Sequence, residues 1–198
     1  MKKYSHLVIS SIAILIIATA TLLMVFLTPE PKKLVTHDTQ ESYSFGGDFV
    51  LTDQDGNKFD SKDYHDKILL VYFGFSSCPD ICYISLHKID SIIDKYNNNR
   101  LQAIFITIDP KKDTPSVLKS YLSQINPKII GLTGTEQEVN HVANLFKVSH
   151  INTLDPSSQQ QTINHSSLSY ILQKGKLVKF FSDDEKVGDI VREMKNMK

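Results

Sequence analysis

The sequence predicts an α/β protein in which a central mixed sheet is flanked by helices. Strand-like apolar segments alternate along the chain with segments of helical periodicity, an order typical of parallel strands joined by helices. Near both ends of this region, glycine-containing turns join two short strand-like segments, which predicts hairpins that contribute antiparallel strands. About 170 residues follow the apolar N-terminus, enough for one domain with its own core.

The first half of the domain is expected to contain a hairpin, two strands and a helix. Asp55-Gly56 lies at the turn of the hairpin predicted for residues 48–59. The most apolar run after the N-terminus, 68–75, is predicted to be the buried central strand, and a second strand is expected at 101–108. Helical spacing between these strands ends at three consecutive asparagines, 97–99.

Capping residues place the helices of the second half. Asp113-Thr114-Pro115 supplies a capping residue and a proline for the first turn of one helix. After a short strand at 129–132, Thr135 and Glu138 have the spacing of a capping box and predict another helix start. The last helix, with its apolar stripe between 187 and 194, is expected to be capped by Ser182 or Asp183.

Two further segments complete the predicted order. The polar stretch 149–163 is expected to be an exposed loop, and Lys174-Gly175 is expected to turn a second hairpin between 167 and 181. The order is therefore hairpin, β, α, β, α, β, α, hairpin, α. This is the layout of a thioredoxin-like fold with an extra N-terminal hairpin.

The N-terminus predicts a membrane anchor. The expected parts of the chain are a short tail at 1–6, a transmembrane helix at 7–27, a linker at 28–43 and the folded domain at 44–198. Ala18-Thr19-Ala20 resembles a signal-peptide cleavage site, but the apolar run continues beyond it, which favours an uncleaved anchor. The short, charged N-terminus fits a cytoplasmic location and places the domain outside the cytosol.

Charge excludes one class of function. Lys and Arg number 22, Asp and Glu also number 22, and the basic residues are scattered along the chain. No basic stretch of the kind that binds nucleic acid is present, so we expect no nucleic-acid partner.

Cys78 and Cys82 are the only cysteines, and three residues separate them directly after the predicted central strand. Open α/β sheets place their functional sites at this carboxyl end of the strands. Pro79 fits the first helical turn, so the two sulfurs should lie one turn apart on the same helix face. Exposed N–H groups at a helix start favour thiolates. The pair suits a dithiol/disulfide couple or a soft metal ion.

The residues alone leave three interpretations of the pair open: structural cysteines, a redox pair, or a metal site for zinc or copper. Two ordinary buried cysteines are the plainest one. A redox pair of the thioredoxin type has two intervening residues, and this pair has three. A zinc site would need two histidines in addition, because the sequence offers no further cysteine. Cuprous copper accepts sulfur ligands and tolerates three-coordination, so one histidine would complete its site. His165, where a polar loop enters a strand, is the favoured candidate, and His150 is second.

Three segments resemble the SCO/SenC family, the copper chaperones of cytochrome c oxidase. Residues 74–82 read GFSSCPDIC and closely resemble the family's G-[YF]-T-x-C-P-D-[IV]-C-P segment. Residues 107–115 read TIDPKKDTP and resemble its S-[VI]-D-P-x-R-D-T-P segment, and Asn164-His165-Ser166 resembles its D-H-[ST] segment. The three matches occur in the family's order, and with the anchor and the domain layout they cover nearly the whole chain.

The resemblance implies one copper ion, Cu(I) with Cu(II) as a second state, bound by Cys78, Cys82 and His165. It implies a membrane-tethered metallochaperone that receives copper from an upstream donor and delivers it to the CuA centre of cytochrome c oxidase subunit II. The alternative is a thiol–disulfide reductase that acts on the cysteines of that subunit. The domain would face the bacterial periplasm or the mitochondrial intermembrane space.

Three departures from the family pattern matter for the site. Tyr83 stands where the family usually has proline, Lys112 replaces arginine, and Asn164 replaces the aspartate before the histidine. Asn164 removes a carboxylate that could orient the His165 ring. Asp80 and Asp109, with Asn164, are candidates for contacts just outside the ligands, although helix-dipole and turn chemistry also explain the two aspartates. The loop 149–163 is expected to move when copper binds.

Overall fold

The computed structural model describes residues 19, 43–78, 81–148, 151–154, 161–164 and 167–197, with the side chains of 151–154 and 161–164 left aside. The chain divides into two compact units, Met1–Thr39 and Gln40–Lys198, and the fold described below belongs to the second. The predicted membrane span 7–27 lies, apart from Thr19, outside the described residues. No helix within the described part of the chain is long and apolar enough to cross a bilayer.

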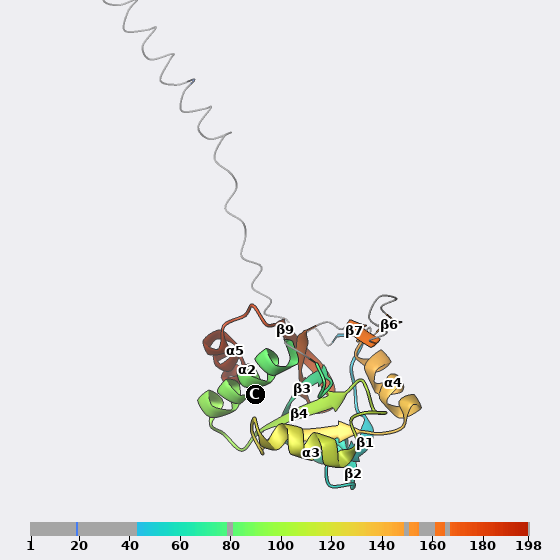
Figure 1. The fold of residues 1–198 in the computed structure, drawn as a ribbon. Helices are drawn as coiled ribbons and strands as arrows, with labels where there is room; N and C mark the ends of the chain where they lie inside the picture. The colour runs from blue at the N-terminus through green and yellow to red at the C-terminus, as the bar shows by residue number, and fades with distance from the viewer. Residues whose placement is uncertain are drawn as a thin grey trace, which may run out of the picture. The chain divides into compact units, whose positions relative to one another are not determined.

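The second unit contains a seven-stranded mixed sheet (Figure 1). The strand order is β2-β1-β5-β4-β3-β8-β9. β3, β4 and β5 are parallel, and the hairpins β1–β2 and β8–β9 add antiparallel strands at the two edges. The strands are β1 (Val50–Asp53), β2 (Lys58–Asp60), β3 (Ile68–Gly74), β4 (Leu101–Thr107), β5 (Ile130–Thr133), β8 (Leu168–Gln173) and β9 (Lys176–Ser182). The predicted mixed sheet and its terminal hairpins are confirmed.

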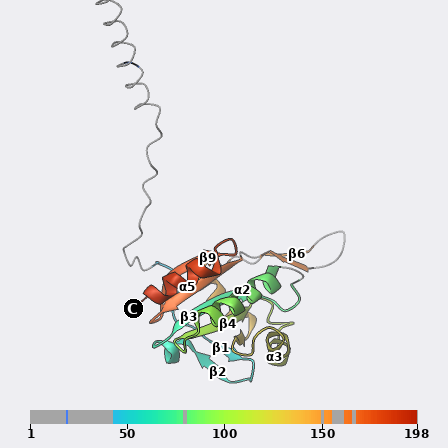
Figure 2. The same ribbon diagram turned by 90° about the vertical axis from the view of Figure 1, so that its left-hand side faces the viewer.

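Helices cover both faces of this sheet. They are α2 (Ile81–Tyr96), α3 (Pro115–Ser123), α4 (Glu136–Leu145) and α5 (Val187–Asn196), and a short 3₁₀ helix, η1 (Ser61–Tyr64), precedes β3. α2 and α3 each connect neighbouring parallel strands in the same direction along the sheet, so right-handed crossovers place them on one face. α5 packs beside α2 in both views (Figures 1 and 2), and α4 lies across the sheet from them.

The core is densest around β3, because every one of its residues is buried. Tyr72 and Phe73 point to opposite faces, as neighbours in a strand must. Tyr72 packs near Phe105 with ring centroids 6.2 Å apart, whereas Phe73 packs on Phe146, just after α4, at 5.3 Å. Each fully buried side chain of this size contributes about 1.5–3 kcal/mol. The unbroken apolar run is therefore explained by helices on both faces of the strand.

Local signals in the sequence predicted most turns and helix starts correctly. Thr135 and Glu138 form the capping box of α4. Gly56, with φ +84°, lies in the first hairpin turn. Lys174 and Gly175, with φ 52° and 70°, turn the second hairpin in the left-handed region that favours glycine. The side-chain chemistry of these turns acts within a few residues, so the sequence reveals it directly.

Two expectations about secondary structure were wrong. The segment expected to be a loop contains β6 (Ile151–Leu154) and β7 (Gln161–Asn164), which pair antiparallel as a separate two-stranded sheet. Their β-branched residues suit strands, but the polar residues between them dominate the pattern. α5 begins at Val187 after Lys186, without a side-chain cap. The carboxylate of Asp183 instead accepts a hydrogen bond from Ser85 Oγ at 2.6 Å.

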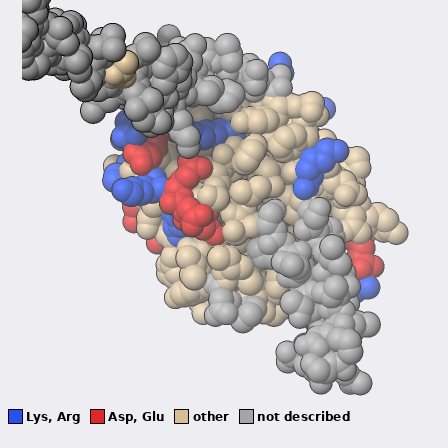
Figure 3. All heavy atoms as spheres, turned by 90° about the horizontal axis from the view of Figure 1, so that it is seen from above, with Lys and Arg blue, Asp and Glu red and all other residues tan. Residues whose placement is uncertain are grey.

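Charged side chains of both signs are mixed on the surface. On the face drawn in Figure 3, the described Lys and Arg side chains lie among Asp and Glu side chains and do not form one broad basic area. This view agrees with the balanced composition of 22 basic and 22 acidic residues.

Candidate metal and thiol site

The two cysteines lie at the carboxyl end of β3, as predicted. β3 ends at Gly74, and the chain turns through Phe75, Ser76 and Ser77 to Cys78 before α2 begins at Ile81. The Cys78 N–H donates to the Phe75 carbonyl oxygen at 3.2 Å, which closes this turn. Cys82 follows in the first turn of α2, so the end of the central strand and the start of one helix supply both sulfurs.

The structure brings the two sulfur-bearing residues together. The backbone N–H of Cys82 donates to Cys78 Sγ at 3.4 Å, the contact that a capping side chain makes at a helix start. Cys78 is partly exposed and Cys82 is fully buried, and no disulfide joins them in the structure. One sulfur is therefore accessible from solvent while the other faces the core.

Gly74 makes room for the buried sulfur. A Cβ atom at this position would lie 3.1 Å from Cys82 Sγ, 3.0 Å from the Tyr72 ring and 2.9 Å from the Phe105 ring. These contacts are shorter than side chains normally tolerate, so glycine is required by close approach rather than by backbone conformation.

Burial controls the protonation of Cys82. It raises the pKa of the Cys82 thiol to about 12, and the neighbouring Cys78 acts in the same direction. Interactions with the Phe75 backbone and the Tyr72 hydroxyl act in the opposite direction and lower this pKa. Without a metal ion or another cation beside it, Cys82 therefore stays protonated at neutral pH.

Two tyrosine hydroxyls face the same region. Burial raises the pKa of Tyr72 above its usual range, and the charge of a Cys82 thiolate would raise it further. Burial also raises the pKa of Tyr121, with Cys82 and Cys78 as the next causes. Within the described part of the chain, the Tyr121 hydroxyl is buried without a hydrogen-bond partner. The two sulfurs therefore lie close to the aromatic side chains of Tyr72 and Tyr121.

The other predicted site residues fall into two groups. Asp109 lies in the β4–α3 connection, where its carboxylate pairs with Lys112 Nζ at 3.3 Å. Asn164 is the last residue of β7 and pairs with Ile151 in the strand register. Asp80 and His165 lie outside the described residues. Within the described residues, no group of three or more His, Cys, Asp or Glu side chains could hold a metal ion.

The described histidines lie away from the sulfurs or point elsewhere. His65 Nε2 is 2.8 Å from Asp48 Oδ1, at the opposite end of β3 from the cysteines. His87 packs its ring against Tyr83, with centroids 4.3 Å apart, on the exposed side of α2. His141 is exposed on α4, across the sheet. None of these three has the placement of a third ligand.

Sequence reasoning missed Asp113. The sequence pattern predicts a helix cap at Asp113-Thr114, but the cap of α3 is Thr114, whose side chain accepts from Val117 N. Asp113 is instead fully buried and accepts hydrogen bonds from Ser76, two residues before Cys78. The available signal was that Thr114-Pro115 already suffices to start the helix, which leaves the preceding aspartate without a local role.

Exposed apolar side chains lie in the first turns of the two helices that follow β3 and β4. Among the described residues, four of the large hydrophobic side chains that are exposed lie in the first turns of α2 and α3: Ile81, Tyr83, Ile84 and Val117. Tyr83 is 55% exposed, so an aromatic ring lies on the surface in the first turn of α2.

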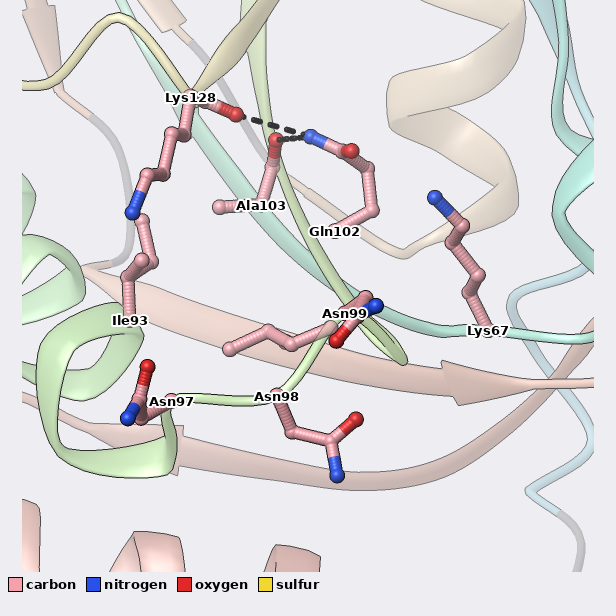
Figure 4. A pocket seen from close by; sticks show the side chains of 9 residues that line it. Lys67, Ile93, Asn97, Asn98, Asn99, Gln102, Ala103 and Lys128 are labelled. Carbon is pink, nitrogen blue, oxygen red and sulfur yellow. Dashed lines mark hydrogen bonds between the residues drawn. The ribbon is translucent and has the colours of Figure 1, made fainter.

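A cavity of about 390 Å³ lies at the other end of the strands. Figure 4 shows Lys67, Lys128 and three asparagines around it, between the end of α2 and the start of β4. Gln102 Nε2 donates to the backbone oxygens of Ala103 and Lys128 across this cavity. It is separate from the cysteines, which lie at the start of α2.

Comparison with known proteins agrees with the motifs and the fold. A model of the SCO1/SenC family matches residues 37–198. The chain belongs to the SCO1/SenC family. A SCO2-like protein of Rickettsia felis is 39% identical over 203 aligned positions, which cover 98% of this chain and 99% of that protein.

Solved structures of SCO proteins share the fold. Arabidopsis thaliana ScoI, solved with copper bound, is 32% identical, with a TM-score of 0.70 and coverage of 77% of this chain and 99% of that chain. Yeast Sco1, also solved with copper bound, is 36% identical, with a TM-score of 0.68 and coverage of 78% and 88%. The thioredoxin-like architecture inferred from the strand order is therefore the architecture of the family.

Proposed function

We propose that this SCO1/SenC protein binds one copper ion through Cys78, Cys82 and His165 and carries it to an assembling cytochrome c oxidase. The observation that supports this most is the placement of two sulfurs at one helix start, with Cys82 N–H directed at Cys78 Sγ at 3.4 Å. Two cysteines that close together can bind one ion, and their sulfur suits Cu(I).

The properties of Cys78 and Cys82 suit a copper ion that must first be bound and then released to an acceptor. The copper ion supplies the positive charge that favours the thiolate form of Cys82, whose pKa burial otherwise raises to about 12. Cys78 is partly exposed, so an acceptor's ligands can approach the ion from that side. His165 would be the third ligand, and Asp80, Asp109 and Asn164 would lie just outside the ligands.

Copper-bound relatives and the motif resemblance support the nature of the cargo and the target. ScoI of Arabidopsis and Sco1 of yeast have been solved with copper bound. The target proposed here is the CuA centre of oxidase subunit II, with copper received from an upstream donor. Residues 7–27 would anchor the domain, 44–198, to the membrane with the N-terminus in the cytoplasm and the domain in the periplasm or the intermembrane space.

A Cu(I) titration of the reduced full-length chain tests the ligand set. Wild type is expected to bind one Cu(I), Cys78→Ala and Cys82→Ala to lose stoichiometric binding, and His165→Ala to bind at least about tenfold more weakly. His141→Ala is the matched control, because His141 is exposed on α4 across the sheet, and it should bind like wild type. Competition with a chromophoric Cu(I) chelator measures the Cu(I) stoichiometry and affinity of wild type and the four variants.

Two results would contradict the proposal. Wild-type affinity in His165→Ala would show that this histidine is not a ligand. Absence of stoichiometric binding in the wild type would remove the copper function altogether.

The asymmetry of the two thiols favours a second function, the reduction of a disulfide in oxidase subunit II. Cys78 is partly exposed and Cys82 is buried, as in a pair of attacking and resolving thiols. The Cys78 thiolate would attack a partner disulfide and release one partner thiolate. Cys82 would then displace the second, which leaves a Cys78–Cys82 disulfide and a reduced partner. This reaction requires no His165, so full reductase activity in His165→Ala would favour it over copper delivery.

A further inference from the structure

Asp113 is a buried carboxylate that accepts hydrogen bonds from the loop after β3 and from the end of β4. Its exposed fraction is 0%. Asp113 Oδ2 accepts from Ser76 N at 3.0 Å and from Thr107 Oγ1 at 2.6 Å, and Oδ1 accepts from Ser76 Oγ. A buried carboxylate is strongly unfavourable unless donors compensate for its lost hydration, and here three donors do so.

Two of these three donors belong to the turn that carries Cys78. Ser76 presents both its backbone N–H and its hydroxyl to Asp113, from a position 37 residues earlier in the chain. The same turn is closed by the bond from Cys78 N to Phe75 O at 3.2 Å. Asp113 thus holds the middle of a short turn whose last residue is Cys78.

The third donor connects the carboxylate to the other strand. Thr107 is the last residue of β4, and its Oγ1 also accepts from Asp109 N at 3.0 Å. The Asp113 N–H donates to the Asp109 oxygen at 2.9 Å. The loop after β4 is therefore held by hydrogen bonds among its own residues. Through the Asp113 carboxylate it also binds the loop after β3.

We propose that Asp113 is a positioning residue for Cys78. By accepting hydrogen bonds from the backbone N–H and the hydroxyl of Ser76, it keeps the Phe75–Cys78 turn in one conformation. In this conformation Cys78 Sγ lies at the start of α2, next to Cys82 N. In its consequence for copper affinity, this inference rests on the proposed copper function. Residues that hold a metal ligand in place typically change metal affinity about 10–100-fold when they are replaced.

Asp113→Ala and Thr107→Val separate positioning from simple stability. Asp113→Ala removes the acceptor of all three bonds, whereas an Asn amide would keep the bonds from Ser76 N and Thr107 Oγ1 on its oxygen and donate its NH₂ group to Ser76 Oγ. Thr107→Val keeps the side-chain shape, removes the Thr107 bond and leaves both Ser76 bonds in place. Both variants lose a buried hydrogen bond, so both should melt at a lower temperature than wild type.

Only Asp113→Ala should affect the cysteine turn. In the reduced, metal-free full-length chain we expect faster hydrogen exchange of the Ser76 amide and a changed alkylation rate of Cys78. Cu(I) affinity should fall about 10–100-fold. Thr107→Val should leave all three quantities near their wild-type values. Ser76→Ala, which removes only the hydroxyl donor of a partly exposed residue, should show a smaller effect in the same direction.

The outcomes distinguish the two proposals. Wild-type Ser76 exchange, Cys78 alkylation and copper affinity in Asp113→Ala would overturn the positioning role, as would equal effects in Thr107→Val. If wild type bound no copper while Asp113→Ala still altered Ser76 exchange and Cys78 alkylation, the positioning role would stand and the copper function would fail. If Asp113→Ala did not fold, an unchanged Cys78 alkylation rate and copper affinity in Ser76→Ala would count against the proposal, and changed values would support it.

Discussion

At the scale of single residues, the site depends on one exposed and one buried sulfur. Cys82 can be fully buried because Gly74 leaves the space that a Cβ atom would occupy at 3.1 Å from its sulfur. The low polarity of this position raises the pKa of the Cys82 thiol to about 12. The Cys82 thiol is therefore protonated in the metal-free protein. A cation that binds to its sulfur must displace this proton.

This proton makes the stability of the reduced protein depend on alkaline pH. The thiol's pKa in the unfolded chain is about 8.5–9, lower than in the folded chain, so the folded state binds more protons between these values. The stabilisation is fully present below about pH 9 and is lost as pH rises toward 12. Urea denaturation between pH 8 and 10.5 should show a fall of up to about 1.4 kcal/mol per pH unit beyond that of Cys82→Ala. Parallel pH profiles of the two proteins would contradict the raised pKa.

At the scale of elements, short-range chemistry sets most boundaries. The capping box of α4 joins Thr135 and Glu138 reciprocally, with Thr135 N donating to Glu138 Oε2 at 2.8 Å and Glu138 N donating to Thr135 Oγ1 at 3.2 Å. The Thr135 backbone bond holds the pKa of Glu138 below its usual value. α5 has no such cap; it packs beside α2, and Asp183, just before it, accepts from Ser85 of α2. Its start is therefore determined by packing.

The capping box should contribute measurably to stability. Thr135→Ala removes the acceptor for Glu138 N and is expected to cost about 1 kcal/mol in the free energy of unfolding. Gln137→Ala, on an exposed position of the same first turn, should change it by less than about 0.5 kcal/mol. Urea denaturation at neutral pH measures both, and equal values for the two variants would show that the box contributes nothing specific.

At the scale of the whole molecule, the sheet brings distant segments to one edge. The parallel pairing of β3 and β4 places the loops that follow them side by side, so that Ser76 reaches Asp113. All buried hydrophobic residues among the described ones lie between Phe49 and Met194. The described residues of the second compact unit, Gln40–Lys198, therefore form a hydrophobic core.

A chain that begins at residue 40 should accordingly fold alone. We expect its thermal midpoint to lie within a few degrees of that of the full chain, and its copper stoichiometry to be equal. Calorimetry of the two proteins under reducing conditions measures this. A fragment that unfolds much earlier would show that the N-terminal unit contributes to the fold.

The amino-acid sequence by itself determined the α/β layout, the hairpin turns, two helix starts and the cysteine pair at the end of the central strand. These features follow from chemistry within a few residues: strand and helix periodicity, left-handed turns and capping. Only the tertiary structure decided that Cys82 is buried, that Asp113 holds Ser76 across 37 residues and that Asp183 binds Ser85 across 98. Such contacts depend on which strands become neighbours. The sequence of each segment shows which hydrogen-bond donors and acceptors it carries. The order of the strands in the sheet determines which of these groups lie close enough to bond.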